Sequence, residues 1–147
     1  MNEYVFDASV IAKWMLPSER EELHLEAREW AARYDRGDLS IIVPDLLWIE
    51  VASLLWKAVR KSRITKQEAT MAIVELRERE LTTIASTPGL LDAALDIALA
   101  CSTSVYDSIY VALARKTNTL LITADQRLAN ALGDRYPVKW LGSLNRR

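Results

Sequence analysis

The chain has few of the residues that cross-link a fold or interrupt its regular structure. Its 147 residues include one cysteine, one histidine, four glycines and four prolines. A lone Cys101 excludes a disulfide within one chain. With a lone His24, it also argues against zinc, whose sites use several sulfur or imidazole ligands, and no nucleophilic triad is visible. The formal net charge of -1 and pI near 5.9 exclude a globally basic nucleic-acid binder.

Long uncharged apolar runs are also missing. The stretch from Ile97 to Ala114 is interrupted by CSTS and by Asp107, so it does not indicate a membrane span. The N-terminus begins with a strand-like pattern and lacks the layout of a signal peptide. We therefore expect a cytoplasmic protein with no membrane partner. The length and the 50% hydrophobic content predict a single domain, 1–147, with a substantial core.

Short apolar runs alternate with amphipathic segments along the whole chain. This alternation is typical of a parallel sheet covered on both faces. We predict an α/β fold with a central parallel sheet of about five strands, flanked by helices on both faces. The predicted strands are Glu3–Phe6, Ser40–Val43, Thr82–Ala85, Leu120–Thr123 and Val138–Leu141.

Helix-capping residues mark where the intervening helices begin. The first helix should carry an apolar face from Leu23 to Tyr34 and end at Gly37, and the second should run to about Lys61. The predicted starts are Ser18 in a capping box with Glu21, Pro44 with Asp45, Thr65 in a capping box with Glu68, Thr87 with Pro88, Ser104, and Asp125.

Four carboxylates each lie in an otherwise uncharged apolar stretch. Asp7 and Asp125 directly follow predicted strands, which places both at the carboxyl edge of the sheet, where open α/β folds hold ligands. Glu50 and Asp107 lie on apolar helix faces and should point inwards. An ionised carboxylate moved out of water costs several kcal/mol unless something compensates it. The four acids together predict a site for a divalent cation.

Each acid alone also has a structural interpretation. Asp7 and Asp125 can act as helix N-caps, and Asp107 can be the third-position acid of a capping box that begins at Ser104. Glu50, in mid-helix, caps nothing and needs a buried partner. The coincidence of four such acids favours the metal site, and ligands that are all oxygen favour Mg²⁺ or Mn²⁺.

Four segments also carry a family resemblance: VFDASVIAKWMLP, PDLLWIEVASLLWKA, SVYDSIYVALA and LLITADQRLANAL. They occur in order from near residue 4 to beyond residue 132. Together they resemble the signature segments of PIN domains, in particular the VapC-type toxins of toxin–antitoxin pairs. The resemblance implies a single PIN-like domain. Its acidic quartet corresponds to Asp7, Glu50, Asp107 and Asp125, and its accompanying hydroxyl residues to Ser9 and Thr123.

Two departures from the family pattern are visible. Ala8 follows the first acid where many relatives have Thr or Ser. After Asp125, the sequence Gln126-Arg127-Leu128 lacks the further Asp or Asn that some relatives carry. The sequence therefore leaves one or two metal ions as alternatives.

The resemblance implies an endoribonuclease in which metal-activated water hydrolyses an RNA phosphodiester bond and leaves 5′-phosphate and 3′-hydroxyl ends. Asp7, Asp107 and Asp125 would bind the metal, and Glu50 would bind it or position the water. Ser9 and Thr123 would support these ligands or contact phosphate. The resemblance also implies a homodimer and a cognate antitoxin protein. No motif identifies the RNA.

An acidic site repels RNA, so basic residues must supply backbone contacts. The stretch from 57 to 66 contains five basic residues and no acid, although an ordinary solvated helix end has the same appearance. A nearby helix carries Trp48 and Trp56 and is apolar around much of its circumference, which indicates a partner surface. The candidate RNA contacts are Lys13, Lys57, Arg60, Lys61, Arg63 and Lys66.

Three other classes of protein fit the chain less well. A phosphoacceptor receiver domain needs an acidic pair near its start and a lysine after a late strand. A haloacid-dehalogenase-type phosphatase needs Asp-x-Asp after its first strand, and Ser9 occupies the second position. The remaining alternative is a PIN-fold RNA-binding or interaction module without catalytic activity.

Overall fold

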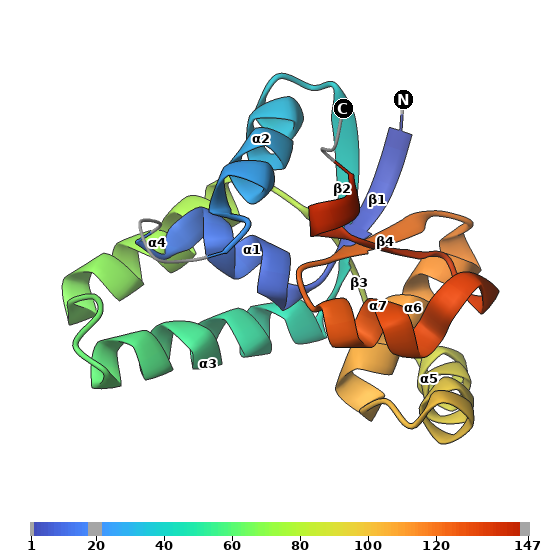
Figure 1. Ribbon diagram of the computed structural model, residues 1–147. Coiled ribbons are helices and arrows are strands. Elements are labelled where there is room, and N and C mark those ends of the chain that lie inside the picture. The colour runs from blue at the N-terminus through green and yellow to red at the C-terminus, as the bar shows by residue number, and fades with distance from the viewer. Residues whose placement is uncertain (1, 18–21, 145–147) are drawn as a thin grey trace.

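A computed structural model of the chain describes residues 2–17 and 22–144. It contains a five-stranded parallel sheet with strand order β3-β2-β1-β4-β5 (Figure 1). The predicted α/β fold is confirmed. The strands are β1 (Asn2–Phe6), β2 (Leu39–Pro44), β3 (Thr82–Ile84), β4 (Leu120–Thr123) and β5 (Val138–Trp140).

Helices connect successive strands and pack on both faces of the sheet. Helix α6 packs against β1, β2 and β4, while α1 packs against β1 and β4, and α2 against β2, from the opposite side (Figure 1). The helices are α1 (Ala8–Met15), α2 (His24–Asp35), α3 (Leu46–Arg60), α4 (Lys66–Glu78), α5 (Pro88–Cys101), α6 (Val105–Thr117) and α7 (Gln126–Leu132), with short 3-10 turns at Gly133–Arg135 and Leu141–Ser143.

The central strands are buried on both faces. Val5 and Phe6 are neighbours in β1 whose side chains point to opposite faces, and both are fully buried. Leu121 and Ile122 in β4 are buried in the same way. Strands covered on both sides become continuous apolar runs, which explains why they are visible in the sequence.

The strand order changes direction between β1 and β4. From β1 the chain proceeds to β2 and β3 on one side, and then crosses back to β4 and β5 on the other side of β1. At such a switch point the connections leave the two strand ends in opposite directions, so a crevice opens at the carboxyl edge. Asp7 follows β1 at this edge, and Asp125 lies just beyond the end of β4.

Most of the predicted helix starts agree with the structure. Thr65 and Glu68 form both bonds of a capping box at the start of α4. Thr87 caps α5 with Pro88 at its first turn, and Ser104 caps α6.

The start of the first predicted helix was wrong. Helix α2 begins at His24, and Leu23 precedes it in a left-handed conformation with φ of 64°. The predicted Ser18–Glu21 capping box lies outside the described residues. The predicted apolar face is still present, because Ala27 and Trp30 are buried.

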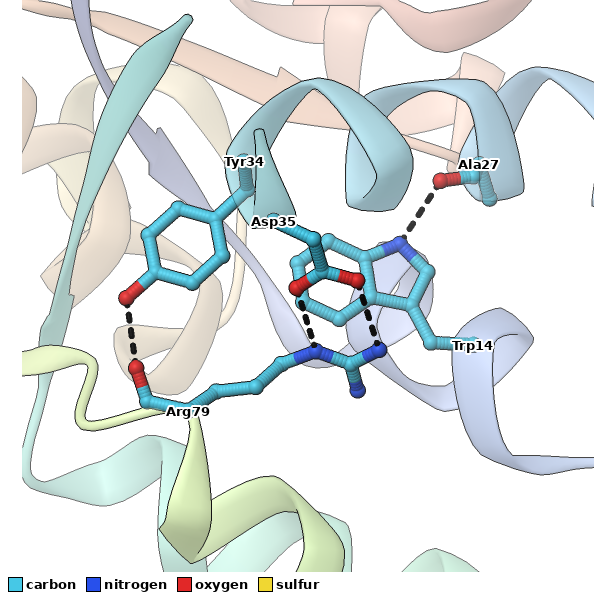
Figure 2. Close-up of polar contacts among 5 residues, drawn as sticks. All are labelled: Trp14, Ala27, Tyr34, Asp35 and Arg79. Carbon is cyan, nitrogen blue, oxygen red and sulfur yellow. Dashed lines mark hydrogen bonds and ion pairs between the residues drawn. The ribbon is translucent and has the colours of Figure 1, made fainter. Parts of the chain in front are cut away.

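A polar network around Arg79 fastens the end of α4 to α2 and α1 (Figure 2). The Arg79 guanidinium pairs with the Asp35 carboxylate at 3.2 and 3.3 Å and lies over the Trp14 ring at 5.3 Å. The Tyr34 hydroxyl donates to the Arg79 carbonyl at 2.6 Å, and Trp14 Nε1 donates to the Ala27 carbonyl at 2.8 Å. The network thus joins three helices on this side of the sheet.

Within the described residues, no single helix has both the length and the apolar character needed to cross a membrane. Only α5 and α6 taken together meet that test of length and composition, and they bend by 115° where they meet.

Candidate active site

The two acids at the strand ends both cap helices. Asp7 Oδ1 accepts hydrogen bonds from the backbone N–H groups of Ser9 and Val10, at 3.1 and 3.3 Å, at the start of α1. Asp125 Oδ1 accepts from Arg127 and Leu128, at 3.0 and 3.2 Å, at the start of α7. The structural interpretation of both residues is therefore correct. Capping also fixes the position of each carboxylate at the carboxyl edge of the sheet.

Two hydroxyl groups connect these strand ends. Ser9 Oγ donates to Asp7 Oδ1 at 2.5 Å and accepts from the backbone N–H of Ala124 at 3.0 Å. The fully buried Thr123 accepts from the backbone N–H of Asp125 at 3.0 Å, and its hydroxyl also hydrogen-bonds Asp7. Ser9 and Thr123 thus fix the two acids relative to each other.

The two helical acids approach the same region from α3 and α6. Both Glu50 and Asp107 are half-buried. Glu50 Oε1 accepts a hydrogen bond from the Tyr110 hydroxyl at 2.7 Å. The backbone N–H of Asp107 donates to Ser104 Oγ at 3.0 Å, which is the cap expected at the start of α6. Tyr110 is the buried partner that Glu50 requires in mid-helix.

One cavity of about 260 Å³ brings the four acids together. Asp7, Glu50, Asp107 and Asp125 all line it, and so does Ser9. Thr123 lies directly behind it through its bond to Asp7. The other lining residues are Ala8, Ser53, Leu54, Lys57 and Tyr110.

Burial and mutual repulsion make it harder for these acids to ionise. Burial raises the pKa of Asp7 to about 6, against the opposing effect of its hydrogen bonds, and the charge of Asp107 adds to the rise. The pKa of Glu50 is raised by burial, lowered in part by the Tyr110 hydrogen bond, and raised further by Asp107. Burial and the nearby charge of Asp125 likewise raise the pKa of Asp107. The cavity therefore has an excess of negative charge that a cation would relieve.

The donor chemistry of the cavity fits a hard divalent cation. Carboxylate and hydroxyl oxygens line it, with no imidazole and no thiol. Within residues 2–17 and 22–144, no group of three or more Asp, Glu, His or Cys side chains is already arranged to hold a metal ion. Asp107 is half-exposed and its printed bond at the helix start uses its backbone N–H, so a bound ion would draw its carboxylate towards the other acids.

The predicted basic residues separate into two groups. Lys57 lines the acidic cavity, and Lys13 and Arg63 line an adjoining cavity of about 330 Å³ that shares Ser9, Leu54 and Asp125 with it. A further cavity of about 470 Å³ continues past Lys13 and Asp125 to Arg127.

The rest of the predicted stretch lies elsewhere. Arg60, Lys61 and Lys66 line none of these three cavities, and Arg60 lies over the exposed Trp56 ring at 5.0 Å. Trp56 and Ile49 are 58% and 70% exposed, so α3 does present apolar side chains to solvent, as its sequence predicts. Trp48 is half-buried and donates to Thr83 Oγ1 at 3.1 Å.

Sequence reasoning missed Tyr110 and Arg127 as site residues. Tyr110 lies one helical turn after Asp107, a spacing that places both on one face of α6. That spacing was visible, but it did not distinguish a core tyrosine from one bonded to an acid on another helix. Arg127 follows Asp125 by two residues, and only the shape of the α7 start shows that it lines a cavity.

The protein is thus an α/β protein with a parallel sheet and an acidic cavity near the switch point of that sheet. This combination is the one expected of a PIN domain. The PIN domain family model matches residues 4–132 of the chain. The chain therefore belongs to the PIN domain family. It is 36% identical over 126 residues to Ribonuclease VapC3 of Pyrobaculum aerophilum, covering 85% of this chain and 91% of that one.

Solved structures share the fold at lower identity. PAE2754 from Pyrobaculum aerophilum superposes with a TM-score of 0.69 at 22% identity, covering 97% of this chain and 93% of that chain. A toxin–antitoxin complex from Klebsiella pneumoniae contains a chain with a TM-score of 0.62 at 15% identity, covering 92% of this chain and 95% of that one. These likenesses show that the fold shared with the two solved structures covers nearly the whole chain.

Proposed function

We propose that the protein is a cytoplasmic endoribonuclease that uses Mg²⁺ or Mn²⁺, and that it is the toxin of a toxin–antitoxin pair. The observation that carries this proposal is the single cavity lined by Asp7, Glu50, Asp107 and Asp125. Membership of the PIN family and the likeness to a VapC ribonuclease supply the substrate class. We take residues 1–147 as one PIN domain.

In this proposal, Asp7, Asp107 and Asp125 hold the metal, and Glu50 either holds it or orients the attacking water. A bound Mg²⁺ or Mn²⁺ supplies a water of lowered pKa and neutralises charge on the phosphate. Hydrolysis adds the water oxygen to phosphorus and breaks the bond to the 3′ oxygen, which takes up a proton. The products carry 5′-phosphate and 3′-hydroxyl ends.

The hydroxyl residues and the cavity walls have supporting roles. Ser9 and Thr123 hold Asp7 in register with the start of α7 through the bonds described above. Since both are tied to backbone N–H groups of the β4 end, their loss would loosen two acids together. Lys57, Lys13, Arg63 and Arg127 give the phosphate backbone a path along the adjoining cavities.

If RNA follows this path, basic residues that line the cavities should contribute to the salt dependence of RNA binding, and basic residues outside the cavities should not. Replacing Lys57 and Arg63 together with Gln should reduce the slope of log K against log[salt] by about 1.4, since each phosphate contact to a single strand contributes about 0.7. Replacing Lys61 and Lys66 together with Gln removes the same charge away from the cavities and should leave the slope unchanged. RNA binding by Asp107→Asn protein, which keeps the RNA intact, gives both slopes. Equal slopes in the two pairs would remove Lys57 and Arg63 from the path.

The alternative is a PIN-fold RNA-binding or interaction module without catalytic activity. It predicts RNA binding whose salt dependence matches that of the nuclease, but no metal-dependent cleavage. Cleavage of total cellular RNA by purified protein, with divalent metal against EDTA, separates the two.

We also propose a homodimer, formed through the outer face of α5. Leu91, Leu95 and Leu99 recur every four residues and are 42%, 48% and 75% exposed, so they form one leucine ridge. The cavity of about 720 Å³ that α5 also lines lies on a different face of this helix, since none of the three leucines lines it.

A second copy fits this face better than another partner. In a two-fold dimer the ridge of one copy packs against the same ridge of the other, so the three exposed leucines of each chain are removed from water. The same patch thereby satisfies both copies.

Sizing chromatography at micromolar concentration tests the dimer. The wild-type protein should elute as a dimer and Leu95→Lys as a monomer, because a lysine in the ridge meets an apolar partner surface. Leu25→Lys introduces the same charge at a leucine of α2 that is 70% exposed, and this variant should stay dimeric. A wild-type monomer, or a dimer that survives Leu95→Lys, contradicts the assignment.

A cognate antitoxin protein is the other proposed partner. The support is the likeness to a VapC protein, together with a toxin–antitoxin complex among the solved structures of this fold. Ile49 and Trp56, exposed on α3 beside the acidic cavity, are the apolar side chains that such a partner could cover while blocking access to the acids.

A further inference from the structure

Tyr110 is an uncharged residue in the wall of the acidic site. It is 1% exposed and lines the same cavity as the four acids. Its hydroxyl donates to Glu50 Oε1 at 2.7 Å, and the backbone of Ala8 is its other hydrogen-bond partner. One phenolic oxygen therefore joins α6 to α3 and to the start of α1, the three helices that carry or adjoin Asp107, Glu50 and Asp7.

We propose that Tyr110 is a positioning residue that holds the Glu50 carboxylate in the geometry needed for metal binding and water activation. This inference rests on the proposed function. It assigns no proton transfer and no direct contact with the reacting phosphate to Tyr110. Its effect acts through Glu50.

The hydroxyl has no packing reason to be there. A phenylalanine would fill nearly the same volume among the buried neighbours of α6, which include Ile109, Val111 and Leu113. A buried hydroxyl loses its hydrogen bonds to water and must replace them in the fold. Tyr110 replaces them with one acid from another helix and one backbone group beside Asp7.

Glu50 needs such a restraint more than the other acids do. Asp7 and Asp125 have short side chains that are fixed by capping bonds to their own helices. Glu50 has a longer, half-buried side chain in mid-helix, where capping is impossible. Without the phenol, repulsion from Asp107 would favour rotamers that turn the carboxylate towards solvent. A hydrogen bond to a charged acceptor is stronger than one between neutral groups, so Tyr110 can hold the inward rotamer.

Tyr110→Phe removes only the oxygen and is the direct test. We expect Mn²⁺ affinity, measured by calorimetry without RNA, to fall about 10-fold, within the range typical of lost supporting bonds at metal sites. The turnover number should fall by a similar factor, with KM for RNA unchanged within about twofold, because the hydrogen bonds of the Tyr110 hydroxyl go to Glu50 and the Ala8 backbone and not to a proposed RNA contact. Tyr34→Phe is the matched control. It removes a hydroxyl that donates to the Arg79 carbonyl at 2.6 Å, away from the site, and should keep wild-type Mn²⁺ affinity and turnover.

A double-mutant cycle tests whether the effect acts through Glu50. In a Glu50→Gln background, Tyr110→Phe should add little further loss of Mn²⁺ affinity or turnover. Full, additive losses would overturn the proposal, because Tyr110 would then act independently of Glu50. Wild-type Mn²⁺ affinity and turnover in Tyr110→Phe would overturn it as well.

A second variant tests the proposal even if Tyr110→Phe does not fold. Glu50→Asp keeps the charge but withdraws the carboxylate from the phenol by one methylene, and it should weaken Mn²⁺ binding to nearly the extent seen with Glu50→Gln. Full affinity in Glu50→Asp would show that position does not matter and would overturn the inference. Failure of the nuclease proposal is distinguishable, because the wild-type protein would then leave RNA intact while the comparison of Mn²⁺ affinities still stands. A wild-type protein that binds no Mn²⁺ would overturn both.

Discussion

Asp7→Asn is expected to stabilise the metal-free protein at pH 7 while it removes the nuclease activity. Asp7 is 5% exposed, and burial raises its pKa from 3.8 to about 6. At pH 7 the wild-type protein must therefore hold an unfavourable buried charge. A shift of this size corresponds to at most ~3 kcal/mol. Asn has no charge to desolvate and keeps an oxygen that can accept from Ser9 and Val10, so we expect a gain of about 1–3 kcal/mol.

The pH dependence has a definite sign. Since the pKa of Asp7 is higher in the folded protein than in the unfolded chain, the folded state binds its proton more tightly. The resulting stabilisation is fully present below pH 3.8 and is lost as the pH rises to about 6. Asp7→Asn lacks this loss, so the variant should gain on the wild type between pH 4 and pH 6 and keep its advantage at pH 7.

Urea unfolding in EDTA at pH 4, 5, 6 and 7 measures the effect. Glu75→Gln is a suitable control, because Glu75 is an exposed acid on α4 away from the cavity and its loss should change the unfolding free energy little. A wild-type protein that is more stable than Asp7→Asn at pH 7 without metal would contradict the account of a site with excess negative charge.

Asp107→Asn is expected to reduce the rate of RNA cleavage about 10³-fold in saturating Mg²⁺ or Mn²⁺. Asp107 lies at the first turn of α6 and faces the cavity that also contains Asp7 and Asp125. Removing one proposed metal ligand forfeits about 4 kcal/mol of transition-state stabilisation, and each 1.36 kcal/mol is tenfold in rate. The backbone bond from Asp107 to Ser104 does not depend on the carboxylate, so α6 should keep its cap.

Single-turnover cleavage of one RNA substrate compares Asp107→Asn with wild-type protein and with Glu75→Gln. Glu75→Gln removes the same charge outside the cavity and should cleave at the wild-type rate. Thermal unfolding should show Asp107→Asn to be folded. An active Asp107→Asn protein, or equal losses in both variants, would remove Asp107 from the catalytic set.

The dual use of Asp7 and Asp125 explains why structural and functional interpretations of the sequence are compatible. A carboxylate that caps a helix at the end of a parallel strand already points to the carboxyl edge of the sheet. Two such strands, β1 and β4, are neighbours at the switch point. Helix capping thus places two of the four acids, Asp7 and Asp125, at the candidate site.

The sequence predicted the sheet well because of how the strands are buried. Runs such as Leu120–Thr123 are largely buried on both faces of the sheet. A strand buried in this way is a continuous apolar run that can be recognised in the sequence. The start of α2 was predicted less well. Leu23 precedes α2 in a left-handed conformation, and the local pattern of apolar residues does not reveal this backbone conformation.

The four acids that line the candidate cavity, and the hydroxyl residues Ser9 and Thr123 bonded beside them, were visible in the sequence, but the Tyr110 contact was not. Each acid was visible as an exception to its apolar surroundings. The bond between Tyr110 and Glu50 joins residues 60 positions apart, and no local pattern specifies it. The basic stretch from 57 to 66 illustrates the same limit, because the turn between α3 and α4 brings Arg63 to the cavities while Lys61 and Lys66 lie outside them.

The measurement that tests the central claim most directly is cleavage of total cellular RNA by the purified protein, freed of any bound partner. It is run in Mg²⁺ or Mn²⁺, in EDTA, and with Asp7→Asn protein, and the product ends are mapped. We predict cuts at discrete sites that need the divalent metal, leave 5′-phosphate and 3′-hydroxyl ends, and disappear in the Asp7→Asn variant. Intact RNA after incubation with a folded, metal-binding protein would contradict the nuclease assignment, and so would cleavage that persists in EDTA or in Asp7→Asn.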